Sequence, residues 1–186
     1  MRRLAHMAIA ALAVLAFSGW VTAADTNTPT SIYNLEAPLR SQDGRAIGLD
    51  VFRGRPVLIT MFYGSCPMAC PLIIDTLRAV ERDLGAQQRA DLRVLMISID
   101  PERDTPQALA ELAKTRRIDT ARWTLAQADE ADVRKIAATL GIQYRELPGG
   151  EFSHASIITM LNEKGEIVVQ SAELGRVDPK LLGALR

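Results

Sequence analysis

Two runs of almost wholly apolar residues, 57–62 and 92–99, stand out in the middle of the chain. Runs of this length and composition predict strands that are buried on both faces of a sheet. A helical pattern follows each run, one beginning at Pro71 and the other at Pro106, because proline is favoured in the first turn of a helix. The side chains expected to face inward are Ile73, Leu77, Val80 and Leu84 in the first helix, and Leu109, Leu112 and Ala113 in the second.

Shorter patterns predict the remaining elements. Before residue 57 there are strand-like pieces at 32–35 and 46–49, around an Asp43-Gly44 turn signal. The later elements are expected to be a strand at 122–125, a helix at 129–140, a strand at 143–146, a hairpin with arms at 156–161 and 166–170, and a helix from near Asp178. Strands that alternate with helices predict a partly parallel sheet covered on both faces. The βαβ unit followed by a hairpin and a last helix predicts an α/β fold, a thioredoxin-like three-layer sandwich with a mixed central sheet.

The first 24 residues differ from the rest. Arg2 and Arg3 precede an apolar run at 4–17, and small residues follow at 21–24. This order is typical of a secretory signal, so we expect export to the periplasm. The apolar run is short for a membrane span, which makes an uncleaved inner-membrane anchor the lesser alternative. We therefore expect a signal at 1–24, a polar linker at 25–31 and one folded domain at 32–186.

Composition narrows the function. The 186 residues are 48% hydrophobic and 24% charged, an ordinary globular balance, and the formal net charge of zero gives no basic footprint for nucleic acid. Beyond the expected signal, the only cysteines are Cys66 and Cys70, and the only histidine is His154. The chemistry of the exported chain is therefore concentrated in these three residues.

Cys66 and Cys70 follow the first apolar run and precede the first helical pattern, so they lie in a strand-to-helix turn. The unpaired N–H groups and positive end of a helix favour thiolate there. A structural disulfide is the ordinary interpretation for an exported protein, but three intervening residues would close too small a loop to stabilise much. The pair is better suited to thiol–disulfide exchange or to binding a soft metal ion.

Three further features bear on the site. With the two thiolates, His154 would complete a ligand set suited to copper or zinc, although a lone histidine is more often simply hydrogen-bonded. The segment 98–106 contains Asp100 and Asp104, which could orient a ligand; more simply, Asp104 or Thr105 caps the helix that begins at Pro106. Met68 lies between the cysteines, where its thioether could touch copper or a partner, or form the apolar rim of the site.

Taken together, these stretches resemble the Sco/SenC family of thioredoxin-like copper proteins, which help to assemble cytochrome c oxidase. The resemblance rests on residues 66–71, then 98–106, then His154, with 46–54 and the hairpin at Gly165 also in keeping. It implies that Cys66, Cys70 and His154 bind a copper ion, as Cu(I) or Cu(II). One departure is Met68, because the family often has an acidic residue directly after Cys-Pro. Another is the N-terminus, since the family usually has a membrane anchor there.

The resemblance implies a periplasmic copper metallochaperone rather than an enzyme. Its client would be a copper enzyme, with the CuA site of cytochrome c oxidase subunit II expected, and its other partners periplasmic copper carriers or thiol reductants. The alternative is a thiol–disulfide oxidoreductase that reduces the client's cysteines before metallation, using Cys66 and Cys70 but not His154. A peroxiredoxin-like peroxidase is less favoured, because the cysteine turn supplies no arginine to activate peroxide.

Overall fold

The computed structural model describes residues 31–186. The expected signal and nearly all of the expected linker lie outside the described residues, so this division of the chain stays a prediction. Within residues 31–186, no helix combines the length and the apolar character needed to cross a membrane.

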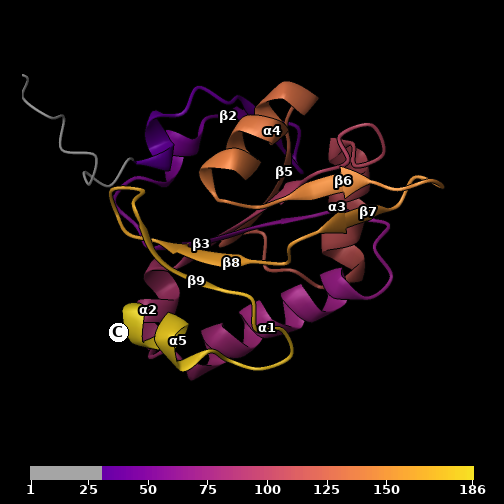
Figure 1. Cartoon of the computed structure of the whole chain (residues 1–186). Helices are drawn as coiled ribbons and strands as arrows, with labels where there is room; N and C mark the ends of the chain where they lie inside the picture. The colour runs from indigo at the N-terminus through magenta and orange to yellow at the C-terminus, as the bar shows by residue number, and fades with distance from the viewer. Residues whose placement is uncertain (1–30) are drawn as a thin grey trace, which may run out of the picture.

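A seven-stranded mixed sheet forms the centre of the molecule, in the order β2-β1-β5-β4-β3-β8-β9 (Figure 1). Its strands are β1 (Leu39–Ser41), β2 (Ala46–Ile47), β3 (Val57–Phe62), β4 (Arg93–Ser98), β5 (Trp123–Gln127), β8 (Ile158–Leu161) and β9 (Ile167–Ser171). The pairs β3–β4 and β4–β5 are parallel, and the other pairs are antiparallel. In the β3–β4 register Phe62 lies opposite Ser98. The loops after these two strands therefore leave the sheet at the same edge, where α/β folds gather their sites.

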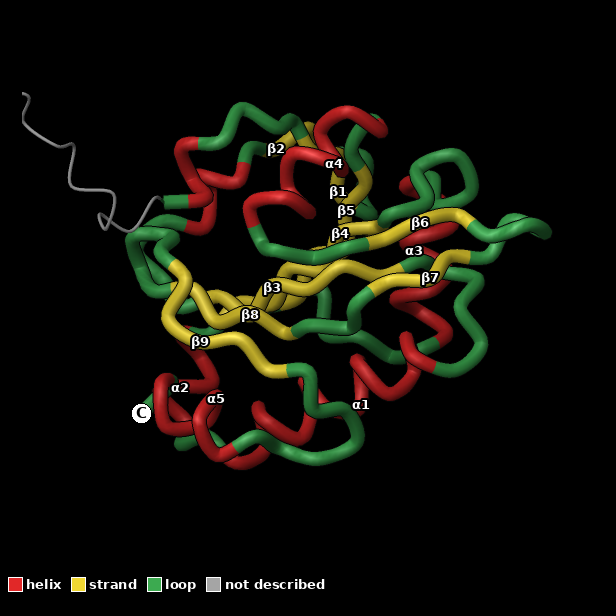
Figure 2. Tube along the Cα trace, viewed as in Figure 1, coloured by secondary structure: helices red, strands yellow, loops and turns green. Residues whose placement is uncertain are grey.

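Helices cover both faces of this sheet. The helices are α1 (Ala69–Asp83), α2 (Ala86–Asp91), α3 (Pro106–Thr115), α4 (Glu130–Thr139) and α5 (Pro179–Ala184). α1 and α5 lie on one side of the sheet and α4 on the other (Figures 1 and 2). This arrangement confirms the three-layer α/β sandwich with a mixed sheet. A separate two-stranded ribbon, β6 (Tyr144–Glu146) and β7 (Phe152–His154), projects near the start of α1 (Figure 2).

The long apolar patterns predicted their elements well. Every residue of β3 is buried, and so is every residue of β4 after Arg93. Pro106 begins α3, and Thr105 caps it by accepting the N–H of Ala108 at 3.3 Å, as one of the two caps considered. Leu112 is half-buried against the core, and the other helix residues expected to face inward are buried: Ile73, Leu77, Val80, Leu84, Leu109 and Ala113.

The short patterns predicted less well. The expected strand at 32–35 is instead a 3₁₀ helix, η1 (Ile32–Asn34), because Ser31 accepts the N–H of Tyr33 and turns the backbone. The expected strand at 46–49 ends at Ile47, since the next 3₁₀ helix, η2 (Leu49–Phe52), begins two residues later. α2 has no buried residue and therefore no apolar periodicity to reveal it. β1 and β7 have only three residues each, too few for a periodic signal.

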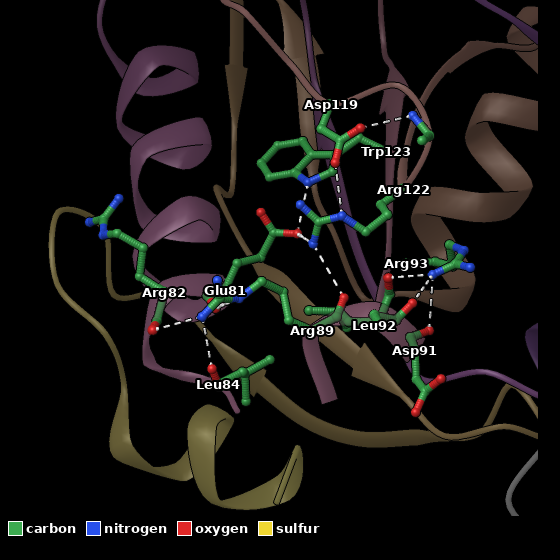
Figure 3. A network of polar contacts seen from close by, with 12 residues as sticks. Glu81, Arg82, Leu84, Arg89, Asp91, Leu92, Arg93, Asp119, Arg122 and Trp123 are labelled. Atoms are coloured by element: carbon green, nitrogen blue, oxygen red, sulfur yellow. Dashed lines mark hydrogen bonds and ion pairs between the residues drawn. The ribbon is translucent and has the colours of Figure 1, made fainter. Parts of the chain in front are cut away.

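A buried carboxylate joins α1 to β5. Glu81 of α1 is 7% exposed, and its Oε1 accepts hydrogen bonds from Arg122 Nη1 at 2.7 Å and from Trp123 Nε1 at 3.1 Å (Figure 3). Arg89 donates to the carbonyl oxygens of Glu81 and Leu84 at the end of the helix, at 2.7 and 2.9 Å. The network fixes the far end of α1 and leaves its N-terminus at the sheet edge.

Candidate metal centre

Cys66 lies in the turn that connects β3 to α1, as predicted, whereas Cys70 lies just inside α1. Both are free thiols, and both are buried, with 8% and 5% of their surface exposed. The Cys70 thiol donates a hydrogen bond to the carbonyl oxygen of Tyr63 at 3.1 Å. Cys66 comes before the first residue of α1, and Cys70 is in the first turn of the helix. The turn therefore holds two nearly enclosed thiols at a helix start.

The surroundings of the two thiols shift their acidities in opposite directions. Burial acts to raise the pKa of Cys66, but the backbone N–H groups of Cys70, Met68 and Ala69 stabilise its thiolate, and the net effect lowers the pKa. Burial raises the pKa of Cys70 to about 12, and the negative charges of Cys66 and Asp104 add to this rise. Cys66 is therefore the thiol that ionises first.

His154 is the last residue of β7 and lies against the cysteine turn. Its ring meets the ring of Tyr63 edge-on, with centroids 5.9 Å apart. Nδ1 and Nε2 of His154 are both buried, and neither has a hydrogen-bond partner among residues 31–186. Burial lowers the pKa of His154, which favours the neutral imidazole that binds metal ions. An unpartnered buried imidazole is unusual, and it calls for a ligand.

The donors fit copper, although the structure brings only part of the predicted set together. Within the part of the chain that the structure describes, no three side chains of His, Cys, Asp or Glu are close enough to hold one ion. The structure pairs Cys66 with Cys70 and places His154 against the ring of Tyr63, whose carbonyl oxygen accepts the hydrogen bond of the Cys70 thiol. Two thiolates and a neutral imidazole match the preferences of copper. The three-residue ligand set stays a prediction.

The segment 98–106 supports the cysteine turn from the next strand. Oδ2 of Asp104 accepts the N–H of Gly64 at 2.8 Å and the hydroxyl of Ser98, and burial raises the pKa of this carboxyl group. A Cβ on residue 64 would lie 2.5 Å from Oδ1 of Asp104, so only glycine fits this contact. Thr105 caps α3, which leaves Asp104 to fasten the cysteine turn rather than the helix.

Arg103 connects the same segment to the ribbon that carries His154. Its side chain forms an ion pair with Asp100 and donates a hydrogen bond to the carbonyl oxygen of Gly150. The guanidinium also lies over the ring of Phe152, 5.8 Å from its centroid. Since Phe152 and His154 share β7, Arg103 helps to hold the histidine near the cysteine turn.

Sequence reasoning missed Tyr63 and Arg103. Tyr63 was visible directly after the first apolar run, but no spacing rule connects it to His154. Arg103 was too far from the cysteines in sequence to be argued from, and only the pairing of β3 with β4 brings its segment close. Both act through contacts between distant segments, which local patterns do not show.

Comparisons with known proteins show which chains this one resembles. A SCO2-like protein of Rickettsia typhi is 24% identical over 136 residues, which cover 70% of this chain but only 65% of that relative. Copper-bound ScoI of Bradyrhizobium japonicum superposes with a TM-score of 0.65 at 24% identity, covering 80% of this chain and 94% of that one. BsSco, a member of the Sco family of cytochrome c oxidase assembly proteins in which a disulfide switch has been identified, gives 0.67 at 19% identity, covering 80% and 88%.

These two structural likenesses show the fold, which is thioredoxin-like as predicted. The family itself is shown by the sequence: the SCO1/SenC family model matches residues 27–178, which is well over half of the chain. The match includes both cysteines, the segment 98–106 and His154. The chain therefore belongs to the SCO1/SenC family.

Proposed function

We propose that this chain is a periplasmic copper metallochaperone that holds copper through Cys66, Cys70 and His154. Two observations carry the proposal: the cysteine turn holds two enclosed free thiols, and an imidazole whose nitrogens lack any partner among residues 31–186 lies against Tyr63 of the same turn. The copper-bound ScoI of the same fold supports the choice of metal. The two cysteines would bind as thiolates and His154 as a neutral imidazole, leaving a fourth position open for an incoming ligand.

The residues around the site account for reversible binding. Copper binding requires both thiols to lose their protons, so affinity falls in acid. The N–H groups at the start of α1 favour the Cys66 thiolate, whereas the enclosed Cys70, whose pKa burial raises to about 12, loses its proton when the metal binds its sulfur. A Cys66–Cys70 disulfide would remove both thiolates, so oxidation would stop copper loading.

The expected client is the CuA site of cytochrome c oxidase subunit II. BsSco belongs to a family of cytochrome c oxidase assembly proteins, which supports this choice for a chain of the same family. Periplasmic export through the signal at 1–24 belongs to the same proposal, because it would put the chain where such a site is assembled.

The test is copper binding by the reduced full-length chain, compared with His154→Ala. Cu(I) affinity would be measured by chelator competition, and Cu(II) binding by the thiolate-to-copper absorption band. We expect tight binding of copper by the wild type and loss of the Cu(II) band in the variant. Ser153→Ala is the matched control, because Ser153 is an exposed neighbour on β7. Weak wild-type binding that His154→Ala leaves unchanged would contradict the proposal.

A thiol–disulfide oxidoreductase is the second candidate. The observation in its favour is the arrangement of the thiol pair, since backbone N–H groups lower the pKa of Cys66 and Cys70 is also enclosed. Such a pair suits attack by Cys66 on a client disulfide and resolution by Cys70. This function needs no histidine. Reduction of a protein disulfide at the wild-type rate by His154→Ala, together with weak copper binding, would favour it.

A further inference from the structure

Met68 is the one methionine side chain that the described region leaves in solvent. It is 76% exposed, whereas Met61 and Met96 are 0% exposed and Met160 is 4% exposed. A methionine side chain exposed to water does not stabilise the core. Because Met68 lies between the two cysteines, its thioether is placed to contact a ligand of that turn. The three buried methionines pack within strands β3, β4 and β8, so they are unable to contact a ligand at the turn.

The backbone of Met68 is already in contact with the thiol site. Its N–H is one of the backbone groups that stabilise the Cys66 thiolate, and the residue is the N-cap of α1 without any side-chain capping bond. The side chain is therefore attached beside Cys66 while making no structural hydrogen bond. Methionine has three rotatable side-chain bonds, so the thioether can fold back over the neighbouring sulfur.

The chemistry of the thioether decides what it would bind. Thiolates and thioethers are soft ligands that select Cu(I), whereas imidazole also suits Cu(II). Cys66 and Cys70 supply two soft sulfurs, and in this structure His154 rests against Tyr63 and is not grouped with both thiols. Among residues 31–186, Met68 is therefore the exposed soft donor that lies next to the pair in the chain.

We propose that Met68 is a third sulfur ligand for Cu(I), which it binds together with Cys66 and Cys70. This inference rests on the proposed function. On entry a Cu–S bond to Met68 forms, the bonds to the two cysteines follow, and the bonds to the previous carrier break. The thiol protons pass to water. No electron is transferred, and the ion stays Cu(I).

The exposure of the Met68 side chain has a second possible explanation. Leu72, one helical turn after Met68, is 45% exposed, so the two side chains could form an apolar contact surface for a client. That explanation needs the apolar area of Met68 but not its sulfur. Met68→Leu separates the two, because it keeps the apolar bulk and removes the thioether.

The experiment compares the wild type, Met68→Leu and Leu72→Ala as reduced full-length chains. Cu(I) affinity is measured by competition with a small-molecule chelator, which makes no use of a docking surface. We expect Met68→Leu to bind Cu(I) about tenfold more weakly, at the low end of changes near a metal site. Leu72→Ala is expected to match the wild type, and the Cu(II) absorption band is expected to be the same in all three.

A second measurement reports the bond itself. X-ray absorption at the copper edge of Cu(I)-loaded, selenomethionine-labelled chain should contain a copper–selenium contribution that is absent from Met68→Leu. Peroxide footprinting is an independent measurement, in which bound Cu(I) should protect Met68 from oxidation. Buried Met61 is the internal control and should stay unreactive with and without copper. Both residues fall in the same tryptic peptide, 54–78.

The outcomes separate this inference from the proposed function. If Cu(I) binding needs both cysteines but Met68→Leu keeps the wild-type affinity and no selenium neighbour is seen, only the ligand role of Met68 is wrong. If the wild type binds no copper, both proposals are wrong. If Leu72→Ala weakens binding as much as Met68→Leu does and selenium is absent, the weaker binding reflects a disturbed helix start and not a lost copper–sulfur bond, and the ligand role fails.

Discussion

The thiols of Cys66 and Cys70 lie in one turn but in different surroundings, and alkylation would measure the difference. In Cys70→Ser, the remaining Cys66 should react with iodoacetamide. The pH at which its rate is half-maximal should lie below the ordinary thiol pKa of about 8.5. In Cys66→Ser, Cys70 should react only at much higher pH, because burial raises its pKa to about 12. Both variants should react alike in concentrated urea. Equal pH midpoints in the folded variants would show that the turn does not distinguish the thiols.

Gly64 carries a steric requirement that is also testable. In Gly64→Ala the new Cβ would meet Oδ1 of Asp104 at 2.5 Å, so the carboxylate must move and release the Gly64 N–H. Leaving these buried groups unpaired should lower the free energy of unfolding by about 1–3 kcal/mol, measured by urea titration. Gly183→Ala in α5 is the control, since a Cβ there meets nothing within 4 Å and alanine favours the helix. A loss of stability in the control but not in Gly64→Ala would contradict the contact.

The attachment of α1 to β5 depends on one carboxylate. Glu81→Ala leaves Arg122 and the buried indole N–H of Trp123 without their shared acceptor, and should lower the free energy of unfolding by about 3 kcal/mol. Glu111→Ala is the control, because its ion pair with Lys114 is long, at 4.0 Å, and exposed. That variant should change stability by less than about 0.5 kcal/mol. The measurement is thermal or urea unfolding. Similar changes in the free energy of unfolding for Glu81→Ala and Glu111→Ala would show that the buried network does not stabilise the fold.

Long elements were predictable from the sequence because their hydrophobic periodicity reflects burial directly. The run at 57–62 is β3 with the predicted bounds, and the helix begun by Pro106 has Thr105, one of the two residues considered, as its cap. The three-residue strand β7 was not predictable, so the position of His154 at its end was not predictable either. Its contact with Tyr63 arises from the pairing of β6 with β7 and from Arg103, none of which leaves a local signal.

The candidate site is assembled from three segments that only the whole fold brings together. Asp104 connects the segment after β4 to the cysteine turn, and Arg103 connects that same segment to the β6–β7 ribbon. The motifs on these segments were each recognisable in the sequence, whereas the contacts between them were not. This explains why the residue types at the site could be predicted while the distances among them required the structure.

The burial of His154 should make the stability of the copper-free protein depend on pH in a definite direction. Burial lowers the pKa of His154 in the folded state below the usual value of about 6.5, so the unfolded chain binds the proton more readily. Stability contributed by this group is present above pH 6.5 and is lost as the pH falls below it. Asp104 acts oppositely and in a lower range, because its raised pKa makes the folded state bind the proton more readily near and above pH 4.

Urea unfolding of copper-free wild type at pH 7 and pH 5 should therefore show a loss of stability that His154→Gln reduces, since glutamine does not titrate. The difference between the two proteins isolates the histidine, because Asp104 and the other carboxylates are present in both. Equal pH dependence in wild type and variant would mean that His154 is freely hydrated in the folded protein. In that case its nitrogens would be satisfied by water, and the strongest structural reason to count it among the copper ligands would be gone.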